Sequence, residues 1–448
     1  MIKVITYGTY DKLHIGHIRL LERAKALGDY LVVGVTADDF DKTRGKINVS
    51  QSLEERIAAV RATGIADEII VESYEGQKID DIRKLGIDIF TVGSDWEGYF
   101  DYLNEYCKVI YLKRTEGVSS SDIRAEEAAI SIGLVGSKNT LRKFVDESHC
   151  VNGVAIKYAC TYEEKLNDAS IEEKEYSEQT YSEMMDKVDA VYISSAPAMH
   201  YSQVKEAIEK GKHVICESPF ATTVKECDEL IKLAEDNKCI LMESIKTAYL
   251  NAYSRLLLLV KSGKIGEVVS VDTICTSIND ISNIDVSELD KRWNSICAWG
   301  PTAMLPVFQL LGTEYKHKRI TSKFVDDSKT YDLFTKVAFE YDNAVASIKV
   351  GKGVKSEGEL IISGTKGYVY VPAPWWKTDY FEIRYEDPNE NKRYFYQLDG
   401  EGIRYEIVEF VRAILNSSKP DFYIERNVSR MFASIAEDFY SGKDLYEI

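Results

Sequence analysis

The sequence lacks the cysteine patterns of small metal-binding and redox proteins. Its eight cysteines are scattered and no two form a C-x-x-C pair, which excludes a zinc ribbon and a thioredoxin-like motif. In a chain of 448 residues, this scatter is typical of reduced thiols in a cytosolic protein. The chain opens directly on a strand-like segment, Ile2 to Tyr7, with no signal peptide. We therefore expect a cytoplasmic location.

Long hydrophobic runs and a basic charge excess are also missing. The longest purely aliphatic run, Leu256 to Val260, is far too short to cross a membrane. Acidic residues outnumber basic ones by 73 to 56, giving a formal net charge of −17. This balance argues against DNA, RNA or an anionic membrane as the main partner. An anionic ligand would therefore have to be held by a locally basic pocket.

The pattern of strands and helices indicates three successive parts. Hydrophobic residues make up 45% and charged residues 29% of the sequence, as in soluble globular proteins, and the length suggests two or three domains. Short apolar runs alternate strictly with helical patterns over residues 1–125, which predicts a parallel, doubly wound sheet. A second α/β pattern covers residues 126–262, in which the acidic stretch Glu163–Asp186 is interpreted as a solvated excursion. Alternating strands then dominate residues 263–448 and predict a mostly antiparallel sheet closed by two helices.

One motif lies at the junction of the first strand and the first helix. The segment Gly8–His17 has His14 and His17 three residues apart, on one face of the first helical turn. Gly16 leaves room for a phosphate near the backbone, where helix N–H groups attract anions. Two imidazoles aimed at one phosphate suit nucleotidyl transfer, because they stabilise charge that develops in the transition state. The alternative is that both histidines only cap the helix.

Two further clusters follow later strands of the first part. Arg114–Ser121 supplies a guanidinium, a flexible glycine and three hydroxyls, a set suited to phosphate oxygens. Ser119 and Asp122 could equally form a helix-capping box, and a capped helix start is itself an anion site. Lys42–Lys46 is a basic loop that on its own would be interpreted as solvated.

Residues 1 to about 124 resemble the glycerol-3-phosphate cytidylyltransferase family of teichoic acid precursor synthesis. The matching segments are Val4–Thr9, His14–His17, Leu20–Lys25, Asp95–Gly98 and Arg114–Gly117. The resemblance implies an N-terminal Rossmann-like nucleotidyltransferase fold that joins CTP to a polyol phosphate, with Mg²⁺ on the triphosphate and a homodimeric, cytoplasmic enzyme. It departs from the family at Ser94, where a second Asp is usual, at Ser120 and Ser121 in place of threonines, and in a longer basic loop.

The same resemblance implies a role for each candidate residue. The expected catalytic residues are His14, His17, Lys46 and Arg114. The expected nucleotide-binding residues are Gly8, Thr9, Gly16, Thr115, Ser119, Ser120 and Ser121. The expected substrate-binding residues are Asp11, Arg44, Asp95 and Trp96. No metal-binding residue is assigned.

Residues 130–448 resemble the Gfo/Idh/MocA oxidoreductase family. The resemblance is carried by Val188–Ile193 with Pro197 and His200, by Ala207–Glu217 with Pro219, and by Lys261–Glu267. It implies a second Rossmann domain over residues 126–262 and an α+β open-sheet domain over residues 263–448.

The motifs that carry activity in this second family are altered. Its G-x-G-x-x-G motif reads Gly136–Leu141 here, with Lys138 and Leu141 in place of the second and third glycines. Cys160 or Thr161 stands where an acidic residue is expected, Ser218 replaces the catalytic lysine, and Ala298 and Thr302 replace an Asp and a His. We therefore expect a domain without redox activity, in which NAD(P) is possible but doubted. The alternatives are a remodelled NAD(P)-dependent reductase of a keto-sugar phosphate, which would make the enzyme bifunctional, and a ligand-binding domain without chemistry.

Overall fold

The chain folds into two compact units in the computed structural model. The first comprises residues 1–129 and 150–154, and the second comprises residues 130–149 and 155–448. The structure describes residues 1–13, 15–38, 49, 51–74, 76–113, 130–151, 153–162, 166, 168–279, 293–325, 327, 329, 331–396, 398, 400–415 and 423–448.

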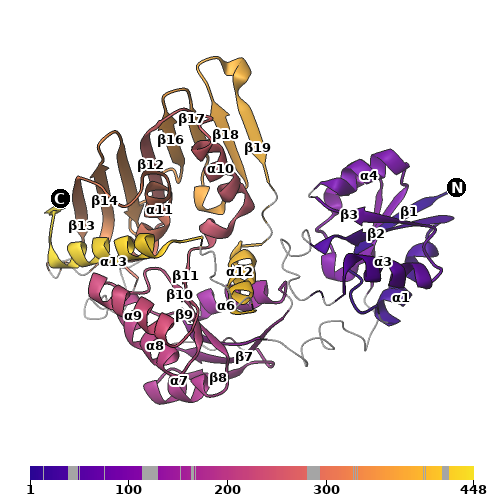
Figure 1. The fold of residues 1–448 in the computed structure, drawn as a ribbon, viewed down its shortest axis with the longest axis horizontal. Helices are drawn as coiled ribbons and strands as arrows, with labels where there is room; N and C mark the ends of the chain where they lie inside the picture. The colour runs from indigo at the N-terminus through magenta and orange to yellow at the C-terminus, as the bar shows by residue number, and fades with distance from the viewer. Residues whose placement is uncertain are drawn as a thin grey trace. The chain divides into compact units, whose positions relative to one another are not determined.

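The first unit is built on a five-stranded parallel sheet in the order β3-β2-β1-β4-β5 (Figure 1). Its strands are β1 (Lys3–Gly8), β2 (Tyr30–Thr36), β3 (Glu68–Glu72), β4 (Ile89–Gly93) and β5 (Lys108–Leu112). Its helices are α1 (Ile15–Lys25), α3 (Leu53–Ala62) and α4 (Gln77–Leu85), and short 3-10 turns cover Ser94–Trp96 and Asp101–Glu105. The strand order reverses between β1 and β4, so the carboxyl ends of these two strands form the ligand-binding edge expected of open α/β sheets.

Apolar side chains on the two faces of this sheet form separate cores. Val4 and Val33 pack with Leu21 of α1 and Val60 of α3 on one face. On the other face, the cluster containing Ile5 and Phe90 packs against α4. Because neighbouring residues of a strand point to opposite faces, one run of apolar residues fills both cores.

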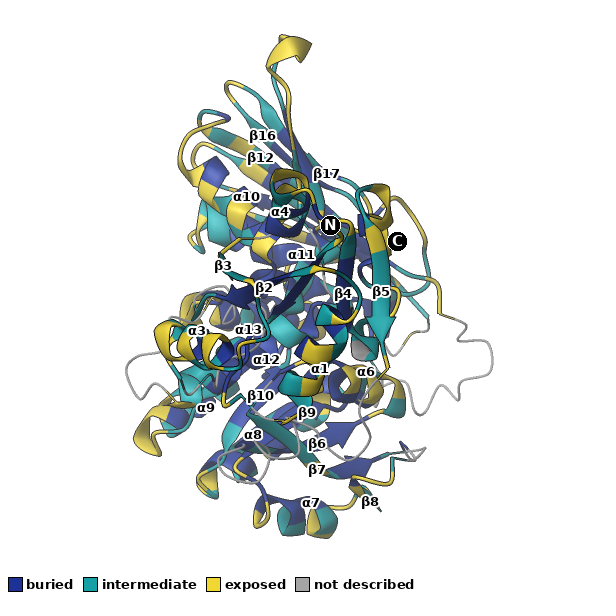
Figure 2. Ribbon diagram, turned by 90° about the vertical axis from the view of Figure 1, so that its right-hand side faces the viewer, coloured by how far each residue is buried: buried dark blue, intermediate teal, exposed yellow. Residues whose placement is uncertain are grey.

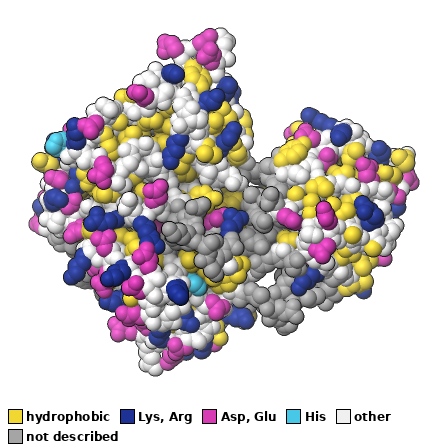
Figure 3. Space-filling model, in the orientation of Figure 1, with side chains coloured by type: hydrophobic (Ala, Val, Ile, Leu, Met, Phe, Trp, Pro, Cys, Tyr) yellow, Lys and Arg dark blue, Asp and Glu magenta, His cyan; other side chains and the backbone are white. Residues whose placement is uncertain are grey.

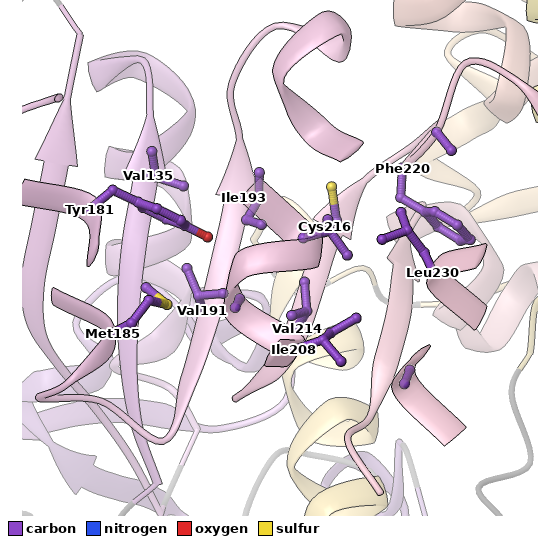
Figure 4. Packing of buried hydrophobic residues seen from close by; sticks show 14 of the residues in the cluster. Val135, Tyr181, Met185, Val191, Ile193, Ile208, Val214, Cys216, Phe220 and Leu230 are labelled. Carbon is purple, nitrogen blue, oxygen red and sulfur yellow. The ribbon is translucent and has the colours of Figure 1, made fainter. Parts of the chain in front are cut away.

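The second unit contains a six-stranded sheet in the order β11-β10-β9-β6-β7-β8. Its strands are β6 (Ile130–Gly136), β7 (Val154–Thr161), β8 (Glu172–Glu175), β9 (Ala190–Ser194), β10 (His213–Glu217) and β11 (Leu241–Ser244). The helices are α6 (Lys138–Ser148), α7 (Glu178–Met185), α8 (Pro197–Glu209), α9 (Val224–Asp236) and α10 (Asn251–Lys261). Figure 4 shows the core beside this sheet, where Val191 and Ile193 of β9 and Val214 of β10 lie beside Ile208 of α8.

The interpretation of Glu163–Asp186 as a solvated excursion is wrong for the described part of that stretch. Residues 172–175 form β8, which pairs in parallel with β7, and α7 follows it directly. Strand β8 lies at the edge of the sheet, so its charged side chains remain at least partly accessible to water. Tyr181, Met184 and Met185 of α7 are nevertheless buried, and these few apolar residues fix the segment to the core.

A nine-stranded mixed sheet completes the second unit, in the order β19-β18-β17-β16-β12-β15-β14-β13-β20. The strands are β12 (Val268–Thr276), β13 (His317–Phe324), β14 (Asp332–Glu340), β15 (Val345–Gly351), β16 (Leu360–Gly364), β17 (Tyr368–Val371), β18 (Tyr380–Arg384), β19 (Lys392–Phe395) and β20 (Leu445–Glu447). The helices are α11 (Ser295–Leu311), α12 (Ile403–Leu415) and α13 (Arg426–Ser441). Helix α11 packs on β12, β14 and β15, and α13 packs on α9 and α11. The prediction of an α/β chain with a second Rossmann-like sheet and an open α+β sheet is therefore confirmed.

The burial and charge patterns agree with these layers. The surface helices carry one buried and one exposed face, as α1 and α3 show in Figure 2. Basic and acidic side chains are interspersed over the face shown in Figure 3. Among the helices that the structure describes, none is long and apolar enough to cross a membrane.

Candidate functional site

The turn between β1 and α1 is a constrained loop at the ligand-binding edge of the first sheet. Tyr10 and Lys12 adopt φ angles of 55° and 46°, in the left-handed region that side chains rarely occupy. Asp11 is fully buried and accepts a hydrogen bond from the backbone N–H of Gln51 at 3.0 Å. Gly8 ends β1, and a Cβ there would lie 3.0 Å from the ring of Tyr10. These contacts and φ angles therefore constrain the backbone of the described residues Gly8–Lys12.

Arg56 of α3 holds this loop through hydrogen bonds to backbone carbonyl oxygens. Its guanidinium is fully buried and donates to the carbonyl oxygens of Thr9 at 2.7 Å and Thr36 at 2.9 Å. It also donates to the carbonyl of Gln51 and forms an ion pair with Asp38. A planar group with several donors can join the ends of β1 and β2 in this way, which a lysine cannot do.

His17 and Trp96 lie at the same edge, on elements that follow β1 and β4. The ring of His17 meets the ring of Tyr10 edge-on, with centroids 5.6 Å apart. Trp96 packs edge-on against Tyr99 at 5.3 Å, in a short turn directly after β4. Thr9, Asp11, Gly16 and His17 thus follow the end of β1, and Trp96 follows the end of the neighbouring strand β4. Their roles in binding and catalysis remain predictions.

Several predicted residues lie outside the described residues. These are His14, Arg44, Lys46, Arg114, Thr115, Ser119, Ser120 and Ser121, together with the side chain of Asp95. Within the ranges that the structure describes, no group of three or more His, Cys, Asp and Glu side chains could hold a metal ion.

A buried ion pair occupies the same edge and was not singled out from the sequence. Lys78 of α4 pairs with Glu72 at the end of β3, and its Nζ lies 4.7 Å from the ring centroid of Tyr7. The hydroxyl of Tyr7 donates to Asp81 at 2.9 Å. Burial and then the charge of Asp81 raise the pKa of Tyr7, so its hydroxyl remains a proton donor. The edge therefore carries the Lys78–Glu72 ion pair and the phenol of Tyr7 besides the predicted motif.

In the second unit, the turn after β6 retains only the first glycine of a dinucleotide motif. Gly136 has a φ of 153°, and a Cβ there would lie 2.1 Å from Oγ of Ser194. Lys138 is the first residue of α6, and Leu141 is fully buried in the contact between α6 and the sheet. Side chains therefore occupy both positions at which glycine normally allows the pyrophosphate and the helix to come close. The residues present do not fit a dinucleotide in the usual pose.

Buried carboxyl groups surround the strand ends where this family has a catalytic lysine. Glu217 of β10 accepts a hydrogen bond from the hydroxyl of Tyr192 at 2.5 Å. The hydroxyl of Ser244 is 3.3 Å from Glu217 and 3.1 Å from Glu406 of α12. Burial raises the pKa of Glu217 and, together with the charge of Glu217, that of Glu406. Ser218 donates its hydroxyl to Glu243 and is buried, so it is committed to a structural contact.

Comparison with known proteins decides the family of the first unit. Residues 5–126 match a family model described as cytidylyltransferase-like. The glycerol-3-phosphate cytidylyltransferase of Bacillus spizizenii is 48% identical over 130 residues, which is 29% of this chain and 100% of the relative. The chain belongs to the cytidylyltransferase family. It is a nucleotidyltransferase, and the resemblance inferred from the HxGH segment is confirmed.

The second unit of this cytidylyltransferase has oxidoreductase relatives. Residues 130–245 match the model of an oxidoreductase family with an NAD-binding Rossmann fold. The scyllo-inositol 2-dehydrogenase (NADP(+)) of Bacillus subtilis is 45% identical over 71 residues, 16% of this chain and 22% of the relative. A 3-ketoreductase from Actinomadura kijaniata, solved with NADP and TDP-benzene, has a TM-score of 0.62 at 16% identity and covers 71% of this chain and 99% of that chain. The Gfo/Idh/MocA resemblance is therefore confirmed as a family match and a fold.

Sequence reasoning missed Arg56, Lys78 and Glu72 of the cytidylyltransferase unit. Each lies outside the quoted motifs, and charged residues on amphipathic helices are ordinarily solvated. The one available signal was position, because all three lie at or shortly after the carboxyl end of a strand or on the helix that follows it.

Proposed function

We propose that the first unit transfers a cytidylyl group from CTP to a polyol phosphate, with glycerol 3-phosphate as the acceptor, and releases pyrophosphate. The main observation behind this proposal is that the first unit is 48% identical to a glycerol-3-phosphate cytidylyltransferase along that protein's entire length. The constrained backbone at Tyr10 and Lys12, directly after β1 at the ligand-binding edge, supports the same chemistry.

The transfer needs no covalent enzyme intermediate. A phosphate oxygen of the polyol phosphate attacks the α-phosphorus of CTP, the new P–O bond forms, and the bond to the pyrophosphate oxygen breaks. We assign His14 and His17 to the charge that develops on the α-phosphate oxygens, and Lys46 and Arg114 to the phosphates. Fixed donors of this kind accelerate the reaction by positioning and by electrostatic stabilisation.

The remaining residues are assigned to the two substrates. Nucleotide contacts are proposed for Gly8, Thr9, Gly16, Thr115, Ser119, Ser120 and Ser121. Polyol-phosphate contacts are proposed for Asp11, Arg44, Asp95 and Trp96. We further propose Mg²⁺ on the triphosphate, a homodimer, and a cytoplasmic role in making a precursor of a cell-envelope polymer.

Product analysis tests this proposal directly. The intact protein is incubated with CTP and a panel of polyol phosphates, and the products are identified by mass spectrometry. We expect a CDP-polyol and pyrophosphate from glycerol 3-phosphate or a close analogue. His17→Ala should abolish most of this product, whereas His317→Ala, an exposed histidine on β13, should not. Consumption of ATP with CTP untouched would refute the nucleotide assignment.

For residues 130–448, we propose a role without hydride transfer. The side chains of Lys138 and Leu141 at the turn support this, as does the contact of Ser218 with Glu243. The rival is a bifunctional enzyme whose second unit reduces a keto-sugar phosphate with NAD(P). The oxidoreductase family match and the NADP complex of the 3-ketoreductase favour that rival.

Calorimetric titration separates the two roles. NAD⁺, NADH, NADP⁺ and NADPH are each titrated into the intact protein, and absorbance at the nicotinamide band is followed with polyols and keto-sugar phosphates. We expect weak binding at most and no turnover. Tight binding together with a substrate-dependent absorbance change would establish the bifunctional enzyme.

A further inference from the structure

A pocket of about 520 Å³ opens in the second unit beside β11, the edge strand of the six-stranded sheet. Helix α9, strand β11, the end of α12 and the start of α13 line it. The apolar part of the wall includes Phe220, Ile231, Ala234, Met242 and Ile424. Phe220 also belongs to the core cluster, where Figure 4 shows it beside Leu230 of α9. This size and this lining are those of a small-molecule site.

This mainly apolar wall also includes the buried residues Glu243, Ser429 and Tyr249. Glu243 of β11 is only 4% exposed. Its Oε1 accepts the hydrogen bond from Ser218, and its backbone carbonyl accepts one from the hydroxyl of Tyr249 at 3.2 Å. Its Oε2 is buried and makes no hydrogen bond of ordinary length among the described residues. Ser429 and the Phe220 backbone make only weaker polar contacts with the carboxyl group. A buried acceptor without a partner costs about 1–3 kcal/mol, and such groups in native proteins call for a donor from outside the chain.

The chemistry of the pocket restricts the group that can supply this donor. The apolar wall requires an apolar body. An anionic head would be repelled by the ionised carboxyl group, whereas a charged ammonium group gives a stronger hydrogen bond to a carboxylate than a neutral donor does. Arg426 at the mouth is already paired with Glu235, so the rim carries charges of both signs. His213 and Lys238 also line the pocket, and Glu243 supplies the buried acidic group of the lining.

We propose that this pocket binds a small molecule with an apolar body and a primary amine, and that the amine donates to Oε2 of Glu243. The site belongs to the second unit and is independent of nucleotidyl transfer. Ser218, which stands where the oxidoreductase family has its lysine, then serves to hold Glu243 at this pocket.

The rate at which Cys239 is alkylated can report whether the pocket is occupied, because Cys239 is one of its lining residues. It lines the pocket and is partly exposed, whereas Cys150 is exposed elsewhere. The intact protein is alkylated with iodoacetamide at about pH 8, above the raised pKa of Glu243, so that its carboxyl group is ionised. Phenylbutylamine or its neutral analogue phenylbutanol is present, and each cysteine is quantified by mass spectrometry. We expect the amine to slow alkylation of Cys239 but not of Cys150, with an apparent affinity about tenfold or more above that of the alcohol.

Three variants make the test specific. Glu243→Gln should remove the preference for the amine, and Ile231→Trp should block protection by filling the pocket. Glu209→Gln, an exposed carboxylate on α8, should leave protection unchanged. Equal protection by amine and alcohol, equal protection in Glu243→Gln, or no protection of Cys239 in the wild type would each overturn the proposal.

Discussion

The substitution Glu243→Gln should change how the stability of the second unit depends on pH. Burial raises the pKa of Glu243 from 4.5 to about 7, with only partial compensation by polar contacts with Ser218, Ser429 and the Phe220 backbone. The folded state therefore binds a proton more tightly than the unfolded chain does. Stability from this group is complete below the unfolded pKa and is lost as the pH rises through about 7.

The pKa difference sets the size of the effect. A shift of this size corresponds to about 3 kcal/mol in total, of which about 2 kcal/mol falls between about pH 5.5 and about pH 8. The glutamine side chain stays neutral throughout, so Glu243→Gln should gain about 2 kcal/mol on the wild type over that interval. Other buried carboxyl groups titrate in both proteins and cancel in the difference.

Urea unfolding of the intact chain provides the assay. Four of the five tryptophans, Trp293, Trp299, Trp375 and Trp376, lie in the second unit, so tryptophan fluorescence mainly reports its unfolding. Glu209→Gln serves as the exposed control and should track the wild type. A difference between Glu243→Gln and wild type that stays constant with pH would show that Glu243 is ionised in the folded state and would refute this reasoning.

Four further substitutions test the nucleotidyltransferase site and the Rossmann turn. His14→Ala and His17→Ala should each lower kcat by about 10²–10³-fold, measured by steady-state kinetics, with little change in the CTP affinity measured by titration. Near-wild-type turnover in either variant would show that the histidine takes no part in the mechanism. Arg56→Lys keeps the charge but loses the planar group that donates to the carbonyls of Thr9 and Thr36, so kcat/KM should fall by roughly tenfold or more. Unchanged kinetics would show that the loop after β1 keeps its conformation without the guanidinium. Gly136→Ala places a Cβ 2.1 Å from Oγ of Ser194 and should lower the free energy of unfolding by on the order of 1–3 kcal/mol, which a lower Tm would report. An unchanged Tm would show that the turn accepts a side chain without strain.

Local patterns were sufficient for most strands and helices. The alternation predicted for residues 1–125 is present as the five-stranded parallel sheet with its helices, and the second α/β pattern is present as the six-stranded sheet. Such segments combine a clear hydrophobic period with a turn or cap at each end, so the signal is contained within the segment itself. The HxGH turn could be located in the same way, because a strand, a glycine and a helix start follow one another in the chain.

Contacts between segments that are distant in the sequence could not be predicted from these local patterns. Strand β8 is short and charged, and only its pairing with β7 makes it a strand. Arg56 is a helix residue like many others until α3 brings it against the loop after β1. Glu243 likewise acquires its raised pKa and its pocket from α9, α12 and α13, which come from three separate stretches of the chain. Burial and desolvation depend on what the fold places around a side chain, and neither is encoded in the spacing of its neighbours in sequence.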